Sequence, residues 1–310
     1  MTKYDIAMIG GDSRTAYMAP YLTKKGYRVA CFNTVSITFG QHLKQKIHYA
    51  DDLRECIDCA DTIVCGIPFL KGEHIFCEEH KIDDAITLAE FQRCIHKHQI
   101  IFAGVIPERF RAVCEEREIY CHDFMLDEPL SIMNAVSTAE GAILEALLHK
   151  NTTLFKSYCL VLGFGRCGKI IADRLKGLHS CVTVCSESET ELASASALGF
   201  HTLRLSKLKQ NIFRYEYIFN TIPACVLDHS CLERTSGDCL IIDIASNRTG
   251  ADYAAAKQLG VNLQFCPGLP GKYAGKSCAK QLSKYVIKHR STYAQKGLQQ
   301  TTQKGDRHST

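Results

Sequence analysis

A glycine-rich turn at residues 163–168 carries the clearest chemical signal in this sequence. Its glycines follow the spacing G-x-G-x-x-G, after an apolar strand predicted over 157–162 and before an apolar-faced helix predicted over 168–178. In this setting the first glycine permits a tight bend, the second lets the backbone approach a pyrophosphate, and the third lets helix and strand pack closely. Free N–H groups at the helix start then bind phosphates. The predicted cofactor contacts are Gly163, Phe164, Gly165, Arg166, Cys167 and Gly168. A turn that only joins strand and helix is the alternative.

The end of the next predicted strand bears on the choice between NAD and NADP. A carboxylate about 20 residues beyond the glycine turn binds the ribose hydroxyls of NAD, whereas an arginine there favours NADP. Ser186 and Glu187 stand at this place, and no basic residue lies beside them. A shift of the alignment by one residue exchanges them, so both are candidate cofactor contacts. A solvated strand end is the alternative for Glu187.

Three further loops follow strands predicted in the second half of the chain, at 220–223, 243–248 and 266–272. Ligands of open parallel sheets bind beyond the carboxyl ends of the strands, so we expect these loops to face the nicotinamide and its reaction partner. Candidate cofactor contacts in them are Asn220, Thr221, Pro223 and Gly268. Turn chemistry alone is the alternative for the loop rich in proline and glycine.

The elements that must position these loops form two α/β blocks. Predicted strands at 4–9, 27–32, 61–66, 99–104 and 118–121 alternate with helices in the first block, and those at 157–162, 181–185, 217–220, 239–244 and 262–265 do so in the second. Such alternation predicts βαβ units. The expected fold class is therefore α/β, with two Rossmann-like doubly wound domains of mostly parallel sheets joined by a long linking helix.

The expected domain boundaries follow from these elements. Residues 1–130 form an N-terminal, substrate-side α/β domain, residues 131–150 the linking helix, and residues 151–275 the NAD(P)-binding domain. A C-terminal helix at 276–292 is expected to pack back toward the N-terminal domain. Residues 293–310 are rich in Gln, Thr, Lys and Gly, so we expect a disordered tail there.

Composition excludes several classes of protein. With 310 residues, 46% hydrophobic and 23% charged, the chain is not a disordered polymer, a collagen-like fibre or a disulfide-stapled miniprotein. The net charge of +4 is small and spread along the chain, which disfavours a nucleic-acid partner. No run of about 18 apolar residues is long enough to cross a membrane, and Asp5 interrupts the N-terminal apolar stretch that a secretory signal needs. We expect a cytoplasmic protein with neither a membrane nor a nucleic-acid partner.

Cysteine is abundant, with 17 residues. Many of them lie in predicted strands, where a reduced thiol packs as a small apolar group. Cys56 and Cys59 form the one C-x-x-C pair, and no second pair or histidine tract completes a zinc site. We therefore expect reduced, mostly structural cysteines and no metal.

Six short motifs, taken in order, resemble one known family. They are Ile9-Gly-Gly-Asp-Ser-Arg14, Asn134-Ala-Val-Ser-Thr-Ala-Glu-Gly141, Leu162-Gly-Phe-Gly-Arg-Cys-Gly-Lys169, Asn220-Thr-Ile-Pro223, Asp243-Ile-Ala-Ser246 and Pro267-Gly-Leu-Pro-Gly271. This set is similar to the A subunit of dipicolinate synthase, from spore-forming bacteria, over residues 4–290. Relatives tend to carry a Gly-Ala-Arg-like sequence after the second strand of the nucleotide domain, which suits NADP. Cys185-Ser186-Glu187 stands there instead, so the choice between NAD and NADP stays open.

The resemblance implies a fold similar to that of formate/glycerate and alanine dehydrogenases. It also implies a pyridine-nucleotide oxidation of a dihydrodipicolinate-type ring, derived from the lysine pathway, to the aromatic dicarboxylate dipicolinate. A flavoprotein-like B subunit is the implied partner, and the cytoplasm of the mother cell during sporulation is the implied location. Whether the chain forms a homo-oligomer is left open.

A dicarboxylate substrate needs cationic or N–H partners. Arg14 is the best candidate, because it follows Ser13 at the start of a predicted helix whose N-terminus also favours anions. Lys276 is a further cation near a predicted helix start. The predicted substrate contacts are Ser13, Arg14, Ser246, Asn247, Arg248 and Lys272. An ordinary surface position is the alternative for each.

Aromatisation of the ring also releases a proton, for which a base is useful. His122, Asp123, Glu128 and Glu140 lie near the predicted domain junction, and the candidate bases are His122, Glu128 and Glu140. Two other functions compete with this interpretation. One is an NAD(P)-dependent dehydrogenase of a 2-hydroxy or 2-amino acid, although the His–acid or Lys–His pair typical of such enzymes has no clear equivalent here. The other is a non-catalytic, nucleotide-binding regulatory subunit.

Overall fold

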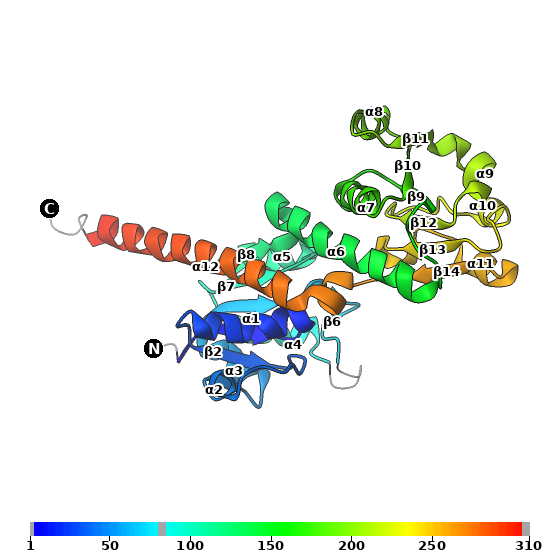
Figure 1. The fold of residues 1–310 in the computed structure, drawn as a ribbon. Coiled ribbons are helices and arrows are strands. Elements are labelled where there is room, and N and C mark those ends of the chain that lie inside the picture. Colours follow the sequence, from blue (N-terminus) through cyan, green and yellow to red (C-terminus); the bar gives the residue numbers. More distant parts are fainter. Residues whose placement is uncertain (1–2, 80–84, 306–310) are drawn as a thin grey trace. The chain divides into compact units, whose positions relative to one another are not determined.

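The computed structural model describes residues 3–79 and 85–305, and the chain divides into two compact units (Figure 1). Unit 1 consists of Met1–Ser131 and Ala274–Thr310, and unit 2 of Ile132–Tyr273. The chain leaves unit 1 within helix α6 (Glu128–His149) and returns to it within α12 (Leu269–Gly305), whose helical backbone is interrupted at Ala274. Each unit has its own sheet and its own buried core.

Unit 1 is built on a six-stranded parallel sheet with the strand order β3-β2-β1-β4-β7-β8. Its strands are β1 (Tyr4–Ile9), β2 (Val29–Phe32), β3 (Ile47–Tyr49), β4 (Ala60–Cys65), β7 (Ile100–Ala103) and β8 (Tyr120–Asp123). The central strands are continuous apolar runs because helices cover both faces of the sheet. Ile9, for example, pairs with both Phe32 and Cys65 and is fully buried.

The helices of unit 1 begin at residues whose side chains cap them. Asp12 caps α1 (Ser13–Lys24), Asp52 caps α3 (Leu53–Asp58), and Thr87 forms a capping box with Glu90 in α4 (Leu88–Cys94). The other elements are α2 (Gln41–Lys44), α5 (Glu108–Glu116) and a small hairpin of β5 (Leu70–Lys71) and β6 (His74–Ile75). The part of α12 from Ala274 onward belongs to this unit, because its residues Ala279, Leu282 and Val286 pack into a core shared with β1 and α1.

Unit 2 repeats the same topology with the strand order β11-β10-β9-β12-β13-β14, again all parallel. Its strands are β9 (Tyr158–Leu162), β10 (Cys181–Ser186), β11 (His201–Arg204), β12 (Tyr217–Asn220), β13 (Leu240–Asp243) and β14 (Asn262–Phe265). In addition to α6, its helices include α7 (Arg166–Gly177), α8 (Glu189–Ala197), α9 (Leu208–Asn211), α10 (His229–Leu232) and α11 (Tyr253–Leu259). Leu162, Asn220 and Asp243 end neighbouring strands in register.

The predicted fold class is confirmed, with two doubly wound α/β units and parallel sheets. In each sheet the strand order reverses beside the first strand, between β1 and β4 and between β9 and β12, and ligands of such sheets bind at this reversal. The predicted disordered tail differs from the structure over 293–305, where α12 continues to Gly305. The last five residues of that predicted tail lie outside the described residues.

Candidate functional site

The glycine turn of unit 2 connects β9 to α7 and has the backbone that the sequence predicts. Gly163 lies in the left-handed region at φ +87°, and a Cβ there would stand 2.7 Å from the Thr221 hydroxyl. A Cβ on Gly168 would overlap the carbonyl oxygen of Gly163, whereas one on Gly165 would meet nothing within 4 Å. The first and third glycines are therefore needed for packing. The second one leaves the loop open on the side where a pyrophosphate would lie.

The backbone of this turn, rather than its side chains, is suited to bind phosphates. Gly165 is the N-cap of α7 and makes no side-chain cap, and both Gly165 and Arg166 are exposed. The ring of Phe164 is fully buried in the core of unit 2. Burial raises the pKa of the Cys167 thiol, so this cysteine is a neutral packing group rather than a reactive thiolate.

Carboxylates gather where β10 ends, beside the glycine turn. Ser186 is buried and donates to Glu191 Oε2 at 2.6 Å, and the Phe164 amide donates to the same oxygen at 3.1 Å. Glu187 is exposed in the bend between them, and Glu189 forms an ion pair with Arg204. Glu191 is absent from the predicted cofactor contacts. The spacing of Ser188, the N-cap of α8, and Glu191 is that of a capping box and predicts that Glu191 lies in the first turn of this helix.

A buried polar network lies at the ends of β12 and β13. Asp243 accepts hydrogen bonds from Asn220 Nδ2 at 3.1 Å, from the Ala245 amide at 2.9 Å and from the Tyr253 hydroxyl. Asn220 and Asp243 are fully buried, and a Cβ on Gly250 would overlap the Asn220 amide. The Asn220 side chain is thus held between the ends of these two strands. Thr221, predicted beside it, donates to the Leu162 carbonyl at 2.8 Å.

Arg248 stands on an aromatic surface next to this network. Its guanidinium carbon lies 4.4 Å from the centroid of the Tyr253 ring and 5.3 Å from that of Phe265. Its backbone is left-handed at φ +55°, which is unusual for a residue other than glycine. Ser246 and Asn247 belong to the same short turn, and Ser246 is exposed. Pro223 and Gly268, in the neighbouring loops, are exposed as well.

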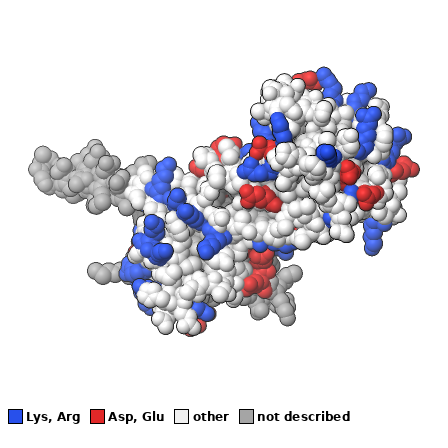
Figure 2. Space-filling view, in the orientation of Figure 1, with Lys and Arg blue, Asp and Glu red and all other residues white. Residues whose placement is uncertain are grey.

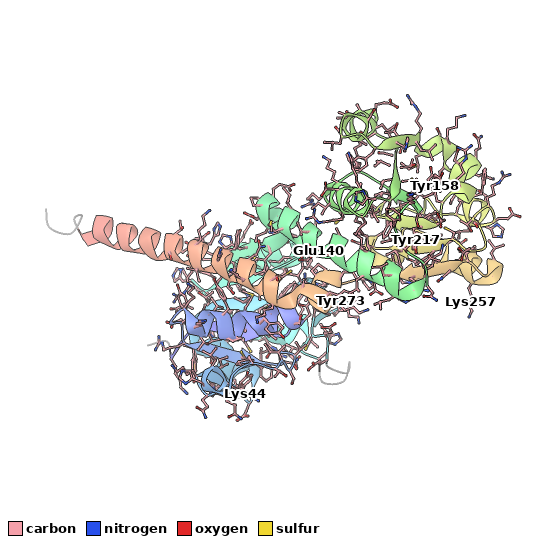
Figure 3. All side chains as sticks on the ribbon, in the orientation of Figure 1. Lys44, Glu140, Tyr158, Tyr217, Lys257 and Tyr273 are labelled. Carbon is pink, nitrogen blue, oxygen red and sulfur yellow. The ribbon has the colours of Figure 1, made fainter. Side chains whose placement is uncertain are left out.

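The other two predicted anchors carry close carboxylate partners. Arg14 is 4% exposed, and its Nε and NH2 groups donate to both Asp12 oxygens at 2.7–3.0 Å. Lys272 Nζ lies 2.7 Å from Glu145 Oε1, which also accepts from the Tyr273 hydroxyl at 2.9 Å. The Glu145 contact raises the pKa of Lys272. Figure 3 labels Tyr273 at the start of α12. Lys276 is exposed on α12.

The corresponding glycine turn of unit 1 is filled by the protein itself. The Gly11 amide donates to the Phe76 carbonyl at 2.6 Å, and a Cβ on Gly10 would stand 2.5 Å from that same oxygen. Asp12 places its own carboxylate on the Arg14 amide at the start of α1. Ser13 packs so closely on Gly275 of α12 that a Cβ there would overlap its hydroxyl. The anion that the α1 N-terminus favours is therefore already present in the chain.

The three candidate bases have different surroundings, His122 and Glu128 in unit 1 and Glu140 in unit 2. His122 lies on β8 among the aromatic rings of Phe102, Tyr285 and Tyr293, and its buried Nε2 has no hydrogen-bond partner among the residues that the structure describes. Glu128 is exposed at the first residue of α6. Glu140, labelled in Figure 3, lines a cavity with Ile143 and the last turns of α7, at the opposite end of that helix from the glycine turn.

Asp123, considered with them, has a structural role. Its carboxylate accepts from the amides of Val105, Ile106 and Met125 and forms a 2.7 Å ion pair with Arg111. It therefore holds the loop after β7.

The surroundings of His122 predict an acid-dependent stability. Burial, aided by His289, lowers the pKa of His122 to about 4 in the folded chain, against about 6.5 when unfolded. Below pH 6.5 the unfolded chain binds a proton at His122 that the folded chain does not. The contribution of His122 to the free energy of unfolding is therefore fully present well above pH 6.5 and is lost as the pH falls from 6.5 toward 4. The expected slope is at most about 1.4 kcal/mol per pH unit. Urea unfolding at several pH values measures it. His122→Phe should flatten this part of the profile, and His42→Ala, at an exposed position, should not. An unchanged slope in His122→Phe would contradict the assignment.

Charge, cysteines and metal-ligand patterns add little to this site. Figure 2 shows Lys and Arg interspersed with Asp and Glu on the face in view. All 17 cysteines are free. Within residues 3–79 and 85–305, no three His, Cys, Asp or Glu side chains are grouped as a metal site requires. The same ranges contain no helix with the length and apolar character of a membrane span.

Comparisons with known proteins agree with the resemblance drawn from the motifs. Residues 5–125 match the model of the N-terminal domain of the dipicolinate synthase A subunit. The dipicolinate synthase A subunit of Bacillus subtilis (strain 168) is 27% identical over 293 residues, which cover 92% of this chain and 97% of that protein.

Two solved structures share the fold. The dipicolinate synthase A chain from Bacillus subtilis has a TM-score of 0.78 at 24% identity, covering 96% of this chain and 98% of its own. An L-alanine dehydrogenase has a TM-score of 0.59 at 13% identity, covering 93% and 90%. The predicted similarity to both kinds of protein is confirmed.

Proposed function

We propose, from the resemblance of this chain to the dipicolinate synthase A subunit, that it oxidises a dihydrodipicolinate-type ring to dipicolinate with a nicotinamide nucleotide. The observation that carries the proposal is the glycine turn of unit 2, in which Gly163 and Gly168 are required by packing while Gly165 faces open space. This turn follows the central strand of a doubly wound sheet, the usual place of a dinucleotide pyrophosphate. The amides that begin α7 would hold the phosphates.

In the reaction the ring loses a hydride and a proton and becomes aromatic. A nicotinamide nucleotide held at the glycine turn would supply the acceptor for the hydride. The protein has to hold the ring in a fixed place, because the gain of aromaticity favours the step. We assign no side chain as the general base, since the candidates lie on separate elements and His122 is enclosed by aromatic rings. The proton is proposed to pass to water.

We propose Arg248 as the main anchor for a substrate carboxylate. Among the candidate cations, Arg14 and Lys272 already face Asp12 and Glu145. Arg248 instead stacks on Tyr253 and Phe265 at the carboxyl edge of the unit 2 sheet, where its guanidinium can form a bidentate contact. Ser246 and Asn247 contribute to the same turn.

We further propose that NAD is preferred to NADP. The support is the set of carboxylates at the end of β10, where Glu187 is exposed and Glu191 is tied to the glycine turn. A 2′-phosphate placed there meets like charge, while ribose hydroxyls meet acceptors. Arg204, which could offset the charge, is paired with Glu189.

This preference predicts that NADPH binds at least about tenfold more weakly than NADH. The chain has no tryptophan, so the fluorescence of the reduced nucleotides measures both affinities without interference. Replacing Glu187 and Glu191 together by Gln should narrow the difference, whereas Glu233→Gln, at an exposed position after α10, should not change it. Tighter binding of NADPH by the wild-type chain would refute the preference.

The name of the relative implies a second kind of subunit, and we propose that this chain has a B subunit for its partner. The cytoplasm of the mother cell in a sporulating bacterium is the proposed location.

The proposed reaction is tested by mixing the purified chain with the dihydrodipicolinate precursor and NAD+ or NADP+, with and without a B subunit. Dipicolinate absorbance and the reduced nucleotide should rise together, one for one. Nucleotide binding without turnover in every arm would point instead to a regulatory subunit. Turnover only with 2-hydroxy or 2-amino acids would point to a different dehydrogenase.

A further inference from the structure

We infer that Tyr253 is a positioning residue, which sets the orientation of the Arg248 guanidinium and is itself held by Asp243. The inference rests on the proposed function, in which Arg248 holds a substrate carboxylate. Tyr253 is absent from the predicted site residues. It is the first residue of α11, after the turn that carries Arg248.

The support beneath Tyr253 is rigid. Asp243 is fully buried at the end of β13, and its carboxylate accepts from Asn220, from the Ala245 amide and from the Tyr253 hydroxyl. A buried carboxylate costs free energy unless such donors surround it, so each donor is held in place. Gly250 closes this arrangement from the side, because only a hydrogen atom fits against the Asn220 amide and the Asp243 oxygens. The hydroxyl end of Tyr253 is therefore held by its hydrogen bond to a buried, hydrogen-bonded carboxylate.

The ring of Tyr253 is the surface on which Arg248 rests. The guanidinium carbon lies 4.4 Å from the ring centroid, within the range of a cation–π contact. Phe265 meets the Tyr253 ring edge-on, with centroids 5.9 Å apart, and contributes a second aromatic contact to Arg248. The left-handed backbone of Arg248 is an uncommon conformation, which persists only where the surroundings hold it.

Tyr253 also keeps two opposite charges apart. It touches the buried carboxylate of Asp243 with its hydroxyl and the guanidinium of Arg248 with its ring face. Without the ring, the cation is no longer held on this surface and the nearby carboxylate becomes a competing partner. Arg14 and Lys272 show the outcome of such pairing, since each lies against a carboxylate of its own unit. The tyrosine thus leaves Arg248 oriented for an external carboxylate.

The test is a double-mutant cycle on the full chain. The single variants are Arg248→Leu and Tyr253→Leu, with Tyr253→Phe to retain the ring and remove the hydroxyl. Tyr158→Leu is the matched control, because Tyr158 is an exposed tyrosine at the opposite end of the unit 2 sheet (Figure 3). Steady-state oxidation gives KM and kcat, calorimetry gives the affinity for dipicolinate, and NADH fluorescence shows that the nucleotide site remains folded.

We expect Tyr253→Leu to raise KM and to weaken dipicolinate binding about tenfold, while kcat changes by less than about threefold. Tyr253→Phe should raise KM by about twofold to threefold, and NADH affinity should not change in any variant. If Tyr253 acts through Arg248, Tyr253→Leu adds less than about a twofold effect in the Arg248→Leu background. If Tyr253→Leu does not fold, the same cycle with Tyr253→Phe decides.

Two results would overturn the inference alone. One is a wild-type KM in a folded Tyr253→Leu chain whose Arg248→Leu counterpart is impaired. The other is a double variant whose fold-change in KM equals the product of the fold-changes of Arg248→Leu and Tyr253→Leu. A wild-type chain that neither turns over the precursor nor binds dipicolinate would instead overturn the proposed function, and the role of Tyr253 with it.

Discussion

Gly165→Val is expected to abolish NADH binding while the chain stays folded. A side chain at this position meets no protein atom within 4 Å, so the substitution costs little in packing. It projects into the space beside the start of α7 where the pyrophosphate would lie, and it keeps the phosphates from the backbone amides. We expect affinity to fall by more than about a hundredfold, measured by NADH fluorescence, because several charge-assisted contacts are lost together.

Gly177→Ala is the matched control for this substitution. Gly177 also leaves a Cβ in open space, but it ends α7 instead of beginning it. Its variant should bind NADH as the wild type does. NADH binding that survives in Gly165→Val would show that the nucleotide, if bound at all, is not held at this turn.

Arg14→Ala is expected to produce the largest loss of stability. Both side chains of the Arg14–Asp12 pair are only 5% exposed, and removing the guanidinium leaves a buried carboxylate without its cation. Breaking such a pair costs about 3–5 kcal/mol. Urea unfolding should reveal this as an earlier transition of unit 1, because the two units have separate cores.

Arg109→Ala provides the comparison within the same unit. Its ion pair with Glu73 is more than half exposed on both sides, so its removal should shift the transition far less. If Arg14 mainly anchored substrate, Arg14→Ala would leave the unfolding transition in place and raise only KM. That outcome would contradict the structural role assigned to the Asp12–Arg14 pair.

The glycine turn of unit 2 was predictable because its determinants are local. Strand, glycines and helix are contiguous in sequence, and Gly168 packs against the backbone of Gly163 within the same turn. The place of the loops after β12 and β13 was predictable for another reason, because the carboxyl ends of parallel strands lie at one edge of the sheet. Alternation of strands and helices was likewise enough to predict two doubly wound units.

The ion-pair partner and the burial of each charged side chain were not predictable in the same way. Lys272 and Glu145 stand 127 residues apart and meet because Gly141 of α6 lets the first turn of α12 approach closely. Asp12 is adjacent to Arg14 in a motif that was recognised. Its burial, however, depends on the segment around Phe76 crossing the end of β1. Pairing and burial of this kind follow from tertiary packing and not from spacing.

Counting residues from the glycine turn predicts Glu187 as the carboxylate at the end of β10, and it does not predict Glu191. The strand-end rule points to a position relative to the glycine turn, and Glu187 satisfies it by count. In the structure the carboxylate that contacts the turn comes from the first turn of α8, one capping-box spacing beyond Ser188. The spacing of Ser188 and Glu191 predicts that Glu191 lies in the first turn of α8, but not that its carboxylate accepts from the Phe164 amide.

The two units begin with equivalent strand–glycine–helix turns, and the two turns differ in what surrounds the start of the helix. In unit 1, the Phe76 carbonyl accepts a hydrogen bond from the Gly11 amide, and the Asp12 carboxylate accepts one from an amide at the start of α1. In unit 2, no side chain caps α7, and Gly165 faces open space. The repeated topology thus has one of the chain's own carboxylates at the start of α1 and no side-chain cap at the start of α7.

The most direct test of this central claim is the number of nucleotides bound by the full-length chain. Calorimetric titration with NADH should saturate at one nucleotide per chain, and Gly165→Val should remove that binding entirely. A stoichiometry of two, or binding that persists in Gly165→Val and disappears when Gly11 is replaced in a chain that still folds, would contradict the assignment of the nucleotide to unit 2.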